Sequence, residues 1–429
     1  MAAQLYKTET GRLFHAGAIC VITVGLPACG KTHSSRLLSR YMRWLGVGTK
    51  VFSVGDYRRK ELGSLPADWF AQENEEGAKI RAELADRCLD DTIHWLLHDG
   101  GQLAIFDGNN VTEQRRTHIR DRLVANDIQA LFIEFICTDP DVILSNIIGV
   151  KLSSPDYQGW DMDKAVADYK ERIERNRSKY ETINDLSTSF IKMIDAGQQL
   201  RVNRVEGYLQ SKIVYFLLNI HIQERTIYLA RAGYSKADNS YKIDAPLTKK
   251  GEEYAQNLAK FISNYRDHKL SSNGVPESKS RPLTVWTSTR RKGLQTALPC
   301  GDYGARVHTL TALTQLNPGE ADGLTPEELE KKFPDEVESA KRNPYHHRYP
   351  RGESYHDLAI RLESVIMALE RERNDVLIIA HDTVLRCLVG YLFDMDENET
   401  PFLEIPRTQV WEATPTAYKS KVRRLDIDA

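Results

Sequence analysis

The stretch that decides the fold is VITVGLPACGKT, residues 21–32. It belongs to an apolar, β-branched run over residues 18–24, which predicts a buried strand. The run breaks at a glycine and continues as G-x-x-x-x-G-K-T, after which an amphipathic helical pattern begins. A strand, a glycine-rich loop and a helix in this order are the context in which the motif binds phosphate groups. We therefore interpret the stretch as a phosphate-binding P-loop and not as a chance match in a surface loop.

The residue types of this loop each have a physical role. Gly25 and Gly30 allow backbone N–H groups to point inward at a phosphate, and the helix N-terminus adds a positive partial charge. Lys31 supplies a mobile positive charge for the β- and γ-phosphates, and the Thr32 hydroxyl can ligate Mg²⁺. The motif therefore predicts phosphoryl-transfer chemistry.

Composition limits the partners. The 429 residues suggest two or three domains, and 58 basic against 60 acidic residues give a net charge of −2, which predicts neither nucleic acid nor membrane as a partner. Six scattered cysteines without a C-x-x-C pair favour a reducing compartment over a disulfide framework or structural zinc. The N-terminus has no apolar signal segment, and no run of about 18 apolar residues occurs. We expect a cytoplasmic protein.

The chain predicts a tail followed by two α/β domains, with boundaries at 1–17, 18–223 and 224–429. Alternating strand and helix patterns in the first domain imply a mostly parallel sheet, whose functional sites gather at the carboxyl ends of the strands. The polar stretch 266–282 predicts an exposed loop. The predicted strands are 50–54, 103–107, 129–137, 191–194, 226–231, 283–288 and 376–381, and the predicted helices include 73–98, 140–150, 161–182, 205–219 and 354–372.

Asp107 ends a buried strand, where a carboxylate can hold Mg²⁺ or accept a proton from an attacking hydroxyl. A helix-capping or turn role is the alternative for this residue. Arginines are frequent in the loops expected after strand ends, and forked guanidiniums suit a phosphate-bearing second substrate. These arginines are Arg58, Arg59, Arg81, Arg115, Arg116 and Arg204. The motifs together predict a small-molecule kinase whose acceptor is anionic.

Several motifs then resemble one family in particular. The chain resembles 6-phosphofructo-2-kinase/fructose-2,6-bisphosphatase over about residues 18–429, most strongly in the first half. That family joins a P-loop kinase to a histidine-phosphatase domain of the phosphoglycerate mutase type. The motifs are GLPACGKT (25–32), SVGDYRR (53–59), NEEGAKIRA (74–82), FDGNNVTEQRR (106–116), FICTDP (135–140), NIIGVKLSSPDY (146–157) and VNRVEGYLQSKIVYFLLNIH (202–221).

The resemblance implies an ATP- and Mg²⁺-dependent kinase that phosphorylates fructose 6-phosphate at its 2-hydroxyl and so makes fructose 2,6-bisphosphate, a regulator of glycolysis. Lys31 and Asp107 would be catalytic, and Thr32 and Asp107 would hold the metal. Gly25, Gly30, Lys31, Thr32, Asn146 and Lys151 would bind the nucleotide. The sugar phosphate would be bound by Arg58, Arg81, Asn109, Arg115, Lys151, Arg204 and Tyr208.

Two positions of the kinase half depart from the family. Cys29 stands where the family usually has Arg, and Asn109 replaces a Thr that contacts the sugar. Asn can still donate and accept hydrogen bonds, so we expect altered sugar affinity and not lost chemistry. Cys137 occupies a family cysteine position, and we expect it to be a packing residue.

The second half resembles a histidine phosphatase that has lost its nucleophile. The family signature R-H-G reads Arg231-Ala232-Gly233, and a methyl group cannot form a phosphoenzyme. The family motif L-N-E reads Leu316-Asn317-Pro318 here, so the proton donor is missing unless Glu320 takes its place. Asp382 replaces a Gln and would repel a phosphate. The degenerate site would comprise Arg231, Ala232, Lys292 in place of an Arg, Glu320, Arg351, His381 and Arg386.

Two alternatives to this kinase stay open at this point. One is a pseudoenzyme that binds a nucleotide and a sugar phosphate in a regulatory role, and the other is a P-loop kinase for a different polyol or nucleoside phosphate. The intact Lys31, Thr32 and Asp107 count against the first. The run VKLSSPDY together with VNRVEGY counts against the second. The oligomeric state is not fixed by the sequence, and a homodimer is one assembly open to it.

Overall fold

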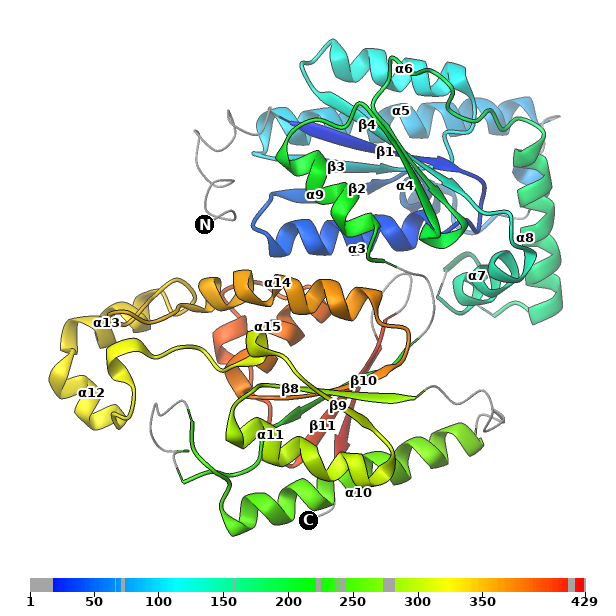
Figure 1. Cartoon of the computed structure of the whole chain (residues 1–429). Coiled ribbons are helices and arrows are strands. Elements are labelled where there is room, and N and C mark those ends of the chain that lie inside the picture. Colours follow the sequence, from blue (N-terminus) through cyan, green and yellow to red (C-terminus); the bar gives the residue numbers. More distant parts are fainter. Residues whose placement is uncertain are drawn as a thin grey trace. The chain divides into compact units, whose positions relative to one another are not determined.

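The computed structural model describes residues 18–65, 67–70, 74–153, 155–157, 159–220, 225–236, 238, 244–272, 282–415 and 421–427. The predicted tail, residues 1–17, lies outside them. The chain divides into two compact units; the described residues of the first end at 220 and those of the second begin at 225. Each unit is an α/β domain built on its own six-stranded sheet (Figure 1). The predicted α/β fold class is thereby confirmed.

The first unit has a mostly parallel sheet with the strand order β2-β3-β1-β4-β5-β6. Only the last pairing, between β5 and β6, is antiparallel. The strands are β1 (Ile19–Gly25), β2 (Thr49–Ser53), β3 (Leu103–Asp107), β4 (Gln129–Ile136), β5 (Phe190–Ile194) and β6 (Gln199–Asn203). Because β1 lies between β3 and β4, the residues that follow their carboxyl ends meet beside the glycine-rich loop.

Helices cover both faces of this sheet. In Figure 1, α5 and α6 lie on one side of the strands and α3 and α9 on the other. The α-helices are α3 (Lys31–Trp44), α4 (Val54–Leu62), α5 (Glu75–His98), α6 (Glu113–Val124), α7 (Pro140–Ser153), α8 (Met162–Arg177) and α9 (Tyr208–Leu217). Short 3₁₀ helices are η1 (Ala67–Phe70), η2 (Pro155–Tyr157) and η3 (Asp195–Gly197).

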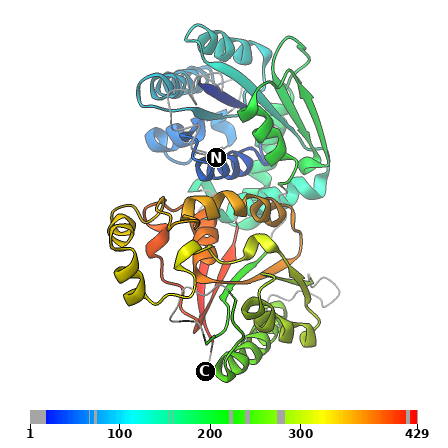
Figure 2. The same ribbon diagram turned by 60° about the vertical axis from the view of Figure 1, so that its left-hand side comes forward.

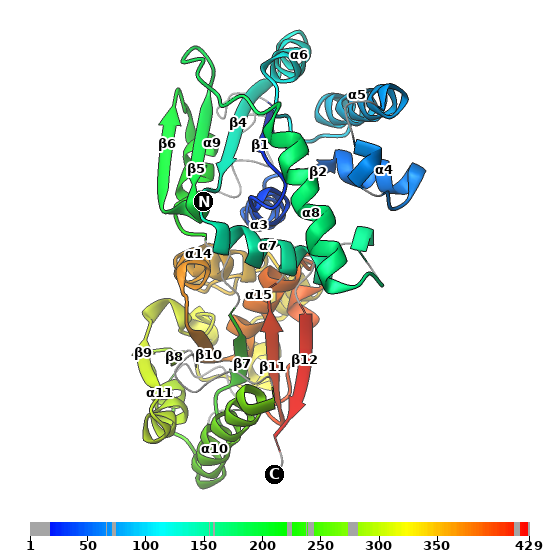
Figure 3. The same ribbon diagram turned by 90° about the vertical axis from the view of Figure 1, so that its right-hand side faces the viewer.

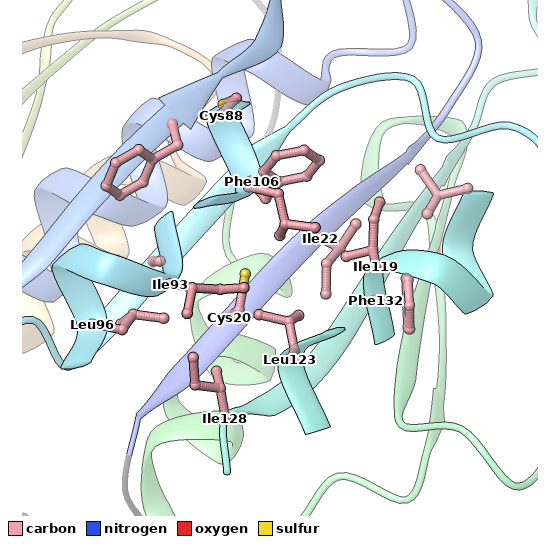
Figure 4. Packing of buried hydrophobic residues seen from close by; sticks show 14 of the residues in the cluster. Cys20, Ile22, Cys88, Ile93, Leu96, Phe106, Ile119, Leu123, Ile128 and Phe132 are labelled. Atoms are coloured by element: carbon pink, nitrogen blue, oxygen red, sulfur yellow. The ribbon is translucent and has the colours of Figure 1, made fainter. Parts of the chain in front are cut away.

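A buried hydrophobic cluster fixes the face covered by α5 and α6. Ile22 of β1 and Phe106 of β3 pack with Ile93 of α5 and Leu123 of α6 (Figure 4). Apolar residues recur at helical spacing on α5 and at alternate positions on the strands, so their side chains gather on one face. The core therefore anchors β1 and β3, the two strands that lead into the candidate site.

The second unit has the strand order β12-β11-β7-β10-β8-β9, and Figure 2 and Figure 3 show this sheet from two further sides. The strands are β7 (Ile227–Arg231), β8 (Leu283–Thr287), β9 (Arg306–Thr309), β10 (Asp375–Ala380), β11 (Gln409–Thr414) and β12 (Lys421–Asp426). β7, β8, β9 and β10 pair in parallel, whereas β11 and β12 are antiparallel. This sheet too is mixed but mostly parallel.

In the second unit α10 and α11 lie on one side of the sheet and α14 and α15 on the other (Figure 1). The α-helices are α10 (Lys249–Ser272), α11 (Arg291–Ala297), α12 (Pro326–Lys332), α13 (Pro334–Arg342), α14 (Tyr355–Arg371) and α15 (Asp382–Phe393). The 3₁₀ helices are η5 (Leu298–Tyr303), η6 (Thr311–Leu313), η7 (Gly319–Ala321) and η8 (Thr400–Phe402). Among all described helices of the chain, none combines the length and the apolar character that a membrane crossing needs.

The structure corrects two details of the sequence interpretation. Residues 266–272 continue α10, so only the remainder of the expected loop 266–282 lies outside that helix. Arg58 and Arg59 lie in α4, Arg81 in α5, and Arg115 and Arg116 in α6, so these arginines are helical and do not lie in loops. The helices begin after the N-caps Ser53, Asn74 and Thr112, of which Ser53 is itself the last residue of a strand, and Arg81 lies inside the helix that was predicted over 73–98.

We expect Leu123→Ala to destabilise the first unit and the matched Leu186→Ala to leave it nearly unchanged. Leu123 is 0% exposed in the core and Leu186 is 68% exposed. The buried truncation should cost about 2–5 kcal/mol and the exposed one less than about 0.5 kcal/mol. Chemical denaturation of the two variants measures both values. Equal losses would show that this core does not hold the unit together.

Candidate nucleotide and sugar-phosphate site

The P-loop joins the end of β1 to the start of α3. Gly25 has a φ of +141°, and a Cβ there would lie 2.5 Å from the carbonyl oxygen of Phe135 on β4, so only glycine fits. Ala28 and Gly30 also have positive φ values, 64° and 83°. The Asn146 side-chain amide of α7 donates to the Ala28 carbonyl at 2.8 Å. The loop is thereby held in a tight curve at the N-terminus of α3, where backbone N–H groups can meet a phosphate.

Asp107 meets the start of α3 directly. The Thr32 hydroxyl donates to the Asp107 carboxylate at 2.9 Å, and the Thr23 hydroxyl lies 3.2 Å from its other oxygen. The Lys31 ammonium donates to the Leu26 carbonyl of the loop at 2.6 Å. Lysine, threonine and aspartate thus converge at the carboxyl ends of β1 and β3.

Burial shapes the electrostatics of this group. Burial raises the pKa of the Asp107 carboxyl, while the positive charge of Lys31 and the hydrogen bond from Thr32 oppose that rise. Burial also lowers the pKa of the Lys31 ammonium, and the negative charge of Asp107 opposes this. The two charges therefore stabilise each other in a site of low polarity, where electrostatic interactions are strong.

The oxygen atoms of this group fit Mg²⁺. A hydroxyl and a carboxylate are hard ligands, and Mg²⁺ is usually bound by one or two carboxylates together with substrate phosphates. Within the described part of the chain no group of three or more His, Cys, Asp or Glu side chains forms an all-protein metal site. Thr32 and Asp107 would hold the ion, which when bound neutralises charge on the β- and γ-phosphate oxygens.

Three arginines from three helices gather around one aromatic ring, that of Phe70 in η1. The guanidinium carbons of Arg172 (α8), Arg58 (α4) and Arg81 (α5) lie 4.7, 5.4 and 5.9 Å from the ring centre. We call these three residues the arginine cluster. Arg58 pairs with Asp156 at 2.5 Å, yet its NH1 atom is buried and has no hydrogen-bond partner among the described residues. The cluster therefore combines positive charge with a hydrogen-bond donor that could bind an anionic group.

Arg115 offers a further donor. Its NH1 atom pairs with Asp86 of α5 at 2.7 Å. Its NH2 atom is buried and, among the described residues, lacks a hydrogen-bond partner. A buried donor without a partner is costly, so this nitrogen is suited to a ligand oxygen.

The second unit has its own polar group where β7 and β10 end side by side. The Ala232 N–H donates to the Ala380 carbonyl at 2.9 Å, and His381 caps α15. Asp382 lies 2.8 Å from His381, 3.4 Å from Arg386 and 3.8 Å from Arg231. Burial raises the pKa of the Asp382 carboxyl, but these three neighbours outweigh it and hold the pKa far below its usual range. Asp382 is therefore a carboxylate at neutral pH.

A second carboxylate pairs with the other cations of this group. Asp238 binds Lys292 at 2.6 Å and Arg407 at 3.1 Å, and Arg407 also donates to the Ala232 carbonyl at 2.9 Å. Each acid of this group pairs with two cations. Asp238 pairs with Lys292 and Arg407, and Asp382 pairs with Arg231 and Arg386. Sequence reasoning missed Asp238 and Arg407, since nothing near them in the chain indicates where they lie.

The chain matches two family models in succession. Residues 6–224 match 6-phosphofructo-2-kinase, and residues 227–428 match the histidine phosphatase superfamily, branch 1. The 6-phosphofructo-2-kinase/fructose-2,6-bisphosphatase 3 of Rattus norvegicus is 40% identical over 419 residues, which span 95% of this chain and 72% of the relative. The chain belongs to the 6-phosphofructo-2-kinase/fructose-2,6-bisphosphatase family.

Other members of the family match as widely. The 6-phosphofructo-2-kinase/fructose-2,6-bisphosphatase 4 of Homo sapiens is 40% identical over 95% of this chain and 85% of its own length. The 6-phosphofructo-2-kinase/fructose-2,6-bisphosphatase of Gallus gallus is 40% identical over 95% of this chain and 84% of its own length. The resemblance stated from the motifs is confirmed.

The structure brings together most of the predicted kinase residues. Asn109 follows Asp107 by two positions, its carbonyl accepts from the Gly25 N–H at 2.9 Å, and its side-chain amide lies 3.5 Å from Asn176 of α8. Lys151 belongs to α7, but its side chain is outside the described residues.

Arg204 and Tyr208 are not brought to this site. Arg204 follows the edge strand β6, three places from β1 in the sheet, and its carbonyl accepts from Ser189, which precedes β5. Tyr208 opens α9 and lies beside Lys212, 5.6 Å from the ring centre. Both lie toward the amino-terminal end of β5, whereas the P-loop lies at the carboxyl ends of the strands.

Arg172, which the sequence analysis did not single out, lies in the arginine cluster. It pairs with Asp168 one turn earlier at 3.0 Å, and in the sequence it looks like an ordinary helical ion pair. Its guanidinium carbon lies over the ring of Phe70, which is distant in the chain, and over that of Tyr157. Sequence periodicity alone therefore could not single it out.

In the second unit Glu320 and Arg351 pair with each other at 3.6 Å. The Arg351 side chain is 86% exposed, and the pair contacts neither Asp238 nor Asp382 through any described ion pair or hydrogen bond. The remaining predicted members belong to the group around the two acids: Arg231, His381 and Arg386 pair with Asp382, Lys292 pairs with Asp238, and the Ala232 carbonyl accepts from Arg407. The expected substitute acid is therefore an exposed residue bound to its own arginine.

Proposed function

We propose that this protein transfers the γ-phosphoryl group of ATP to the 2-hydroxyl of fructose 6-phosphate and so makes fructose 2,6-bisphosphate. The observation that carries the proposal is the contact of Thr32 with Asp107 at the mouth of the P-loop. It joins a magnesium-binding hydroxyl to a carboxylate that can hold the ion or accept the acceptor's proton. Family membership supports the choice of sugar.

The proposed roles divide among three groups of residues. The nucleotide is bound by Gly25, Gly30, Lys31, Thr32, Asn146 and Lys151. Thr32 and Asp107 hold Mg²⁺, and Lys31 and Asp107 act in phosphoryl transfer. Arg58, Arg81, Arg115 and Asn109 bind the sugar phosphate, and Arg172 joins them in place of Arg204 and Tyr208. The kinase domain spans residues 18–223 and the phosphatase-like domain residues 224–429.

We further propose that the second domain does not hydrolyse fructose 2,6-bisphosphate. The family's nucleophilic histidine is Ala232 here, and a methyl group cannot accept a phosphoryl group. Asp238 and Asp382 are paired with the cations that would otherwise contact a phosphate. A phosphate entering this group would have to displace its own carboxylates and would be repelled by them.

The direct test of the kinase is product identification. Purified protein incubated with ATP, Mg²⁺ and fructose 6-phosphate should convert them to ADP and fructose 2,6-bisphosphate, as phosphorus NMR can distinguish by the phosphate on C2. Transfer to another hydroxyl, or to water only, would contradict the proposal.

We expect Lys31→Ala and Asp107→Ala each to reduce kinase turnover by roughly 10²-fold or more. Both remove charges that stabilise the transferring phosphoryl group. The exposed Lys79 of α5 supplies a matched control, since Lys79→Ala should leave turnover unchanged. Steady-state rates and thermal unfolding of the three variants separate lost chemistry from lost fold. A folded variant at Lys31 or Asp107 with near-normal turnover would remove that residue from the mechanism.

We expect Arg81→Ala and Arg172→Ala to raise the KM for fructose 6-phosphate about 10-fold or more while changing the KM for ATP little. Each removes a charge-assisted contact worth about 1.5–3 kcal/mol. Arg204→Ala is the matched control, and it should leave both constants unchanged. A rise in the KM for ATP, or an effect of Arg204→Ala as large as the others, would show that the division of the site is wrong.

We expect no release of inorganic phosphate from fructose 2,6-bisphosphate and no phosphohistidine on the protein. Ala232→His should restore little activity, because the two carboxylates and the missing acid at Pro318 remain. A catalytically active family member serves as the positive control in a phosphate-release assay. Turnover within about tenfold of that control would contradict the proposed silence of this domain.

A further inference from the structure

Phe70 occupies a central place in the arginine cluster, yet it has no group that could take part in chemistry. Its ring lies within 6 Å of three guanidiniums that come from α4, α5 and α8. α8 is far from α4 and α5 in the chain, and the Phe70 ring is a feature that the three arginines share. An aromatic face attracts cations through its quadrupole, and the attraction grows when the pair is shielded from water.

The backbone around Phe70 orients the same arginines. Arg81 donates to the Trp69 carbonyl at 2.9 Å, and its guanidinium carbon lies 5.1 Å from the centre of the Trp69 ring. Arg172 donates to the Leu65 carbonyl at 2.5 Å. The Asn74 amide also donates to the Trp69 carbonyl, at 3.0 Å. The segment therefore holds Arg81 and Arg172 by carbonyls as well as by aromatic faces.

The charges of the cluster are incompletely balanced. Arg58 pairs with Asp156 and Arg172 with Asp168, but Arg81 has no carboxylate partner among the described residues. Burial lowers the pKa of Arg58, and the charges of Arg59 and Arg172 add to this while Asp156 opposes it. Burial alone lowers the pKa of Arg81. The three cations repel one another, and the two carboxylates leave room for a further anion to reduce this repulsion.

We propose that Phe70 is a positioning residue for the phosphate of the sugar substrate: it holds the three guanidiniums together so that their free N–H groups face one anion. This inference rests on the proposed function for its ligand, fructose 6-phosphate. A phenyl ring suits the role because it attracts the faces of the guanidiniums without using their hydrogen-bond donors. A phosphomonoester, with a charge of about −1.5 to −2, fits a cluster in which Arg81 has no carboxylate partner among the described residues.

The test compares Phe70→Leu with Phe70→Trp and Phe70→Tyr. Loss of the ring in Phe70→Leu should raise the KM for fructose 6-phosphate about tenfold, with kcat and the KM for ATP changed less than about twofold. The aromatic variants should keep the KM within about threefold of wild type. Phe216→Leu, which alters the stacked Tyr41–Phe216 pair elsewhere in the same unit, controls for general loosening and should leave both KM values unchanged.

A second measurement separates positioning from simple destabilisation. Isothermal titration of wild type with fructose 6-phosphate should show binding that rising salt weakens, and Phe70→Leu should lose most of that binding while it keeps affinity for ATP with Mg²⁺. Should Phe70→Leu not fold, Phe70→Met removes the ring at similar volume and carries the same expectation.

The outcomes are distinguishable. If wild-type protein makes no fructose 2,6-bisphosphate and binds no fructose 6-phosphate, the proposed function fails and this inference fails with it. If wild-type protein is active and Phe70→Leu keeps its KM for fructose 6-phosphate, the positioning role alone is overturned. Equal increases in both KM values would also overturn it, because that result would indicate general damage to the site.

Discussion

The kinase half depends on one buried carboxylate. Asp107 ends β3 inside the protein, where an ionised group needs partners to offset the loss of water. Two threonine hydroxyls and the nearby Lys31 supply them. Because β1 and β3 are parallel neighbours, Thr23 and the P-loop reach this carboxylate from the adjacent strand. The position of the nucleotide loop, the proposed metal site and the acceptor site all follow from this single arrangement.

The two units use charge in opposite ways. In the first, Arg81 has no carboxylate partner and the NH1 atom of Arg58 has no hydrogen-bond partner among the described residues, which leaves both able to bind an anion. In the second, Asp238 and Asp382 between them pair with Lys292, Arg407, Arg231 and Arg386, the described lysine and arginines of the group around Ala232. Similar numbers of basic side chains therefore have different consequences, because what matters for binding is whether the protein itself already supplies the counterion.

The sequence predicted those features that are local in the chain. The P-loop, the strand before it and Asp107 at the next strand end follow from short patterns, since strand, turn and helix preferences act over a few residues. Arg172 and Asp238 were missed, and Arg204 was assigned to a site that it does not reach. Their roles depend on contacts between distant segments, such as Arg172 with Phe70, which no local pattern contains. The edge strand β6 escaped prediction because its polar residues do not alternate with a buried set.

The most direct test of this account is a crystal structure with Mg²⁺, a non-hydrolysable ATP analogue and fructose 6-phosphate. The account predicts Mg²⁺ between Thr32 and Asp107, the 6-phosphate on the arginine cluster, and the sugar's 2-hydroxyl facing Asp107 and the γ-phosphate. A 6-phosphate bound elsewhere, or a metal ion without contact to Thr32 and Asp107, would contradict it.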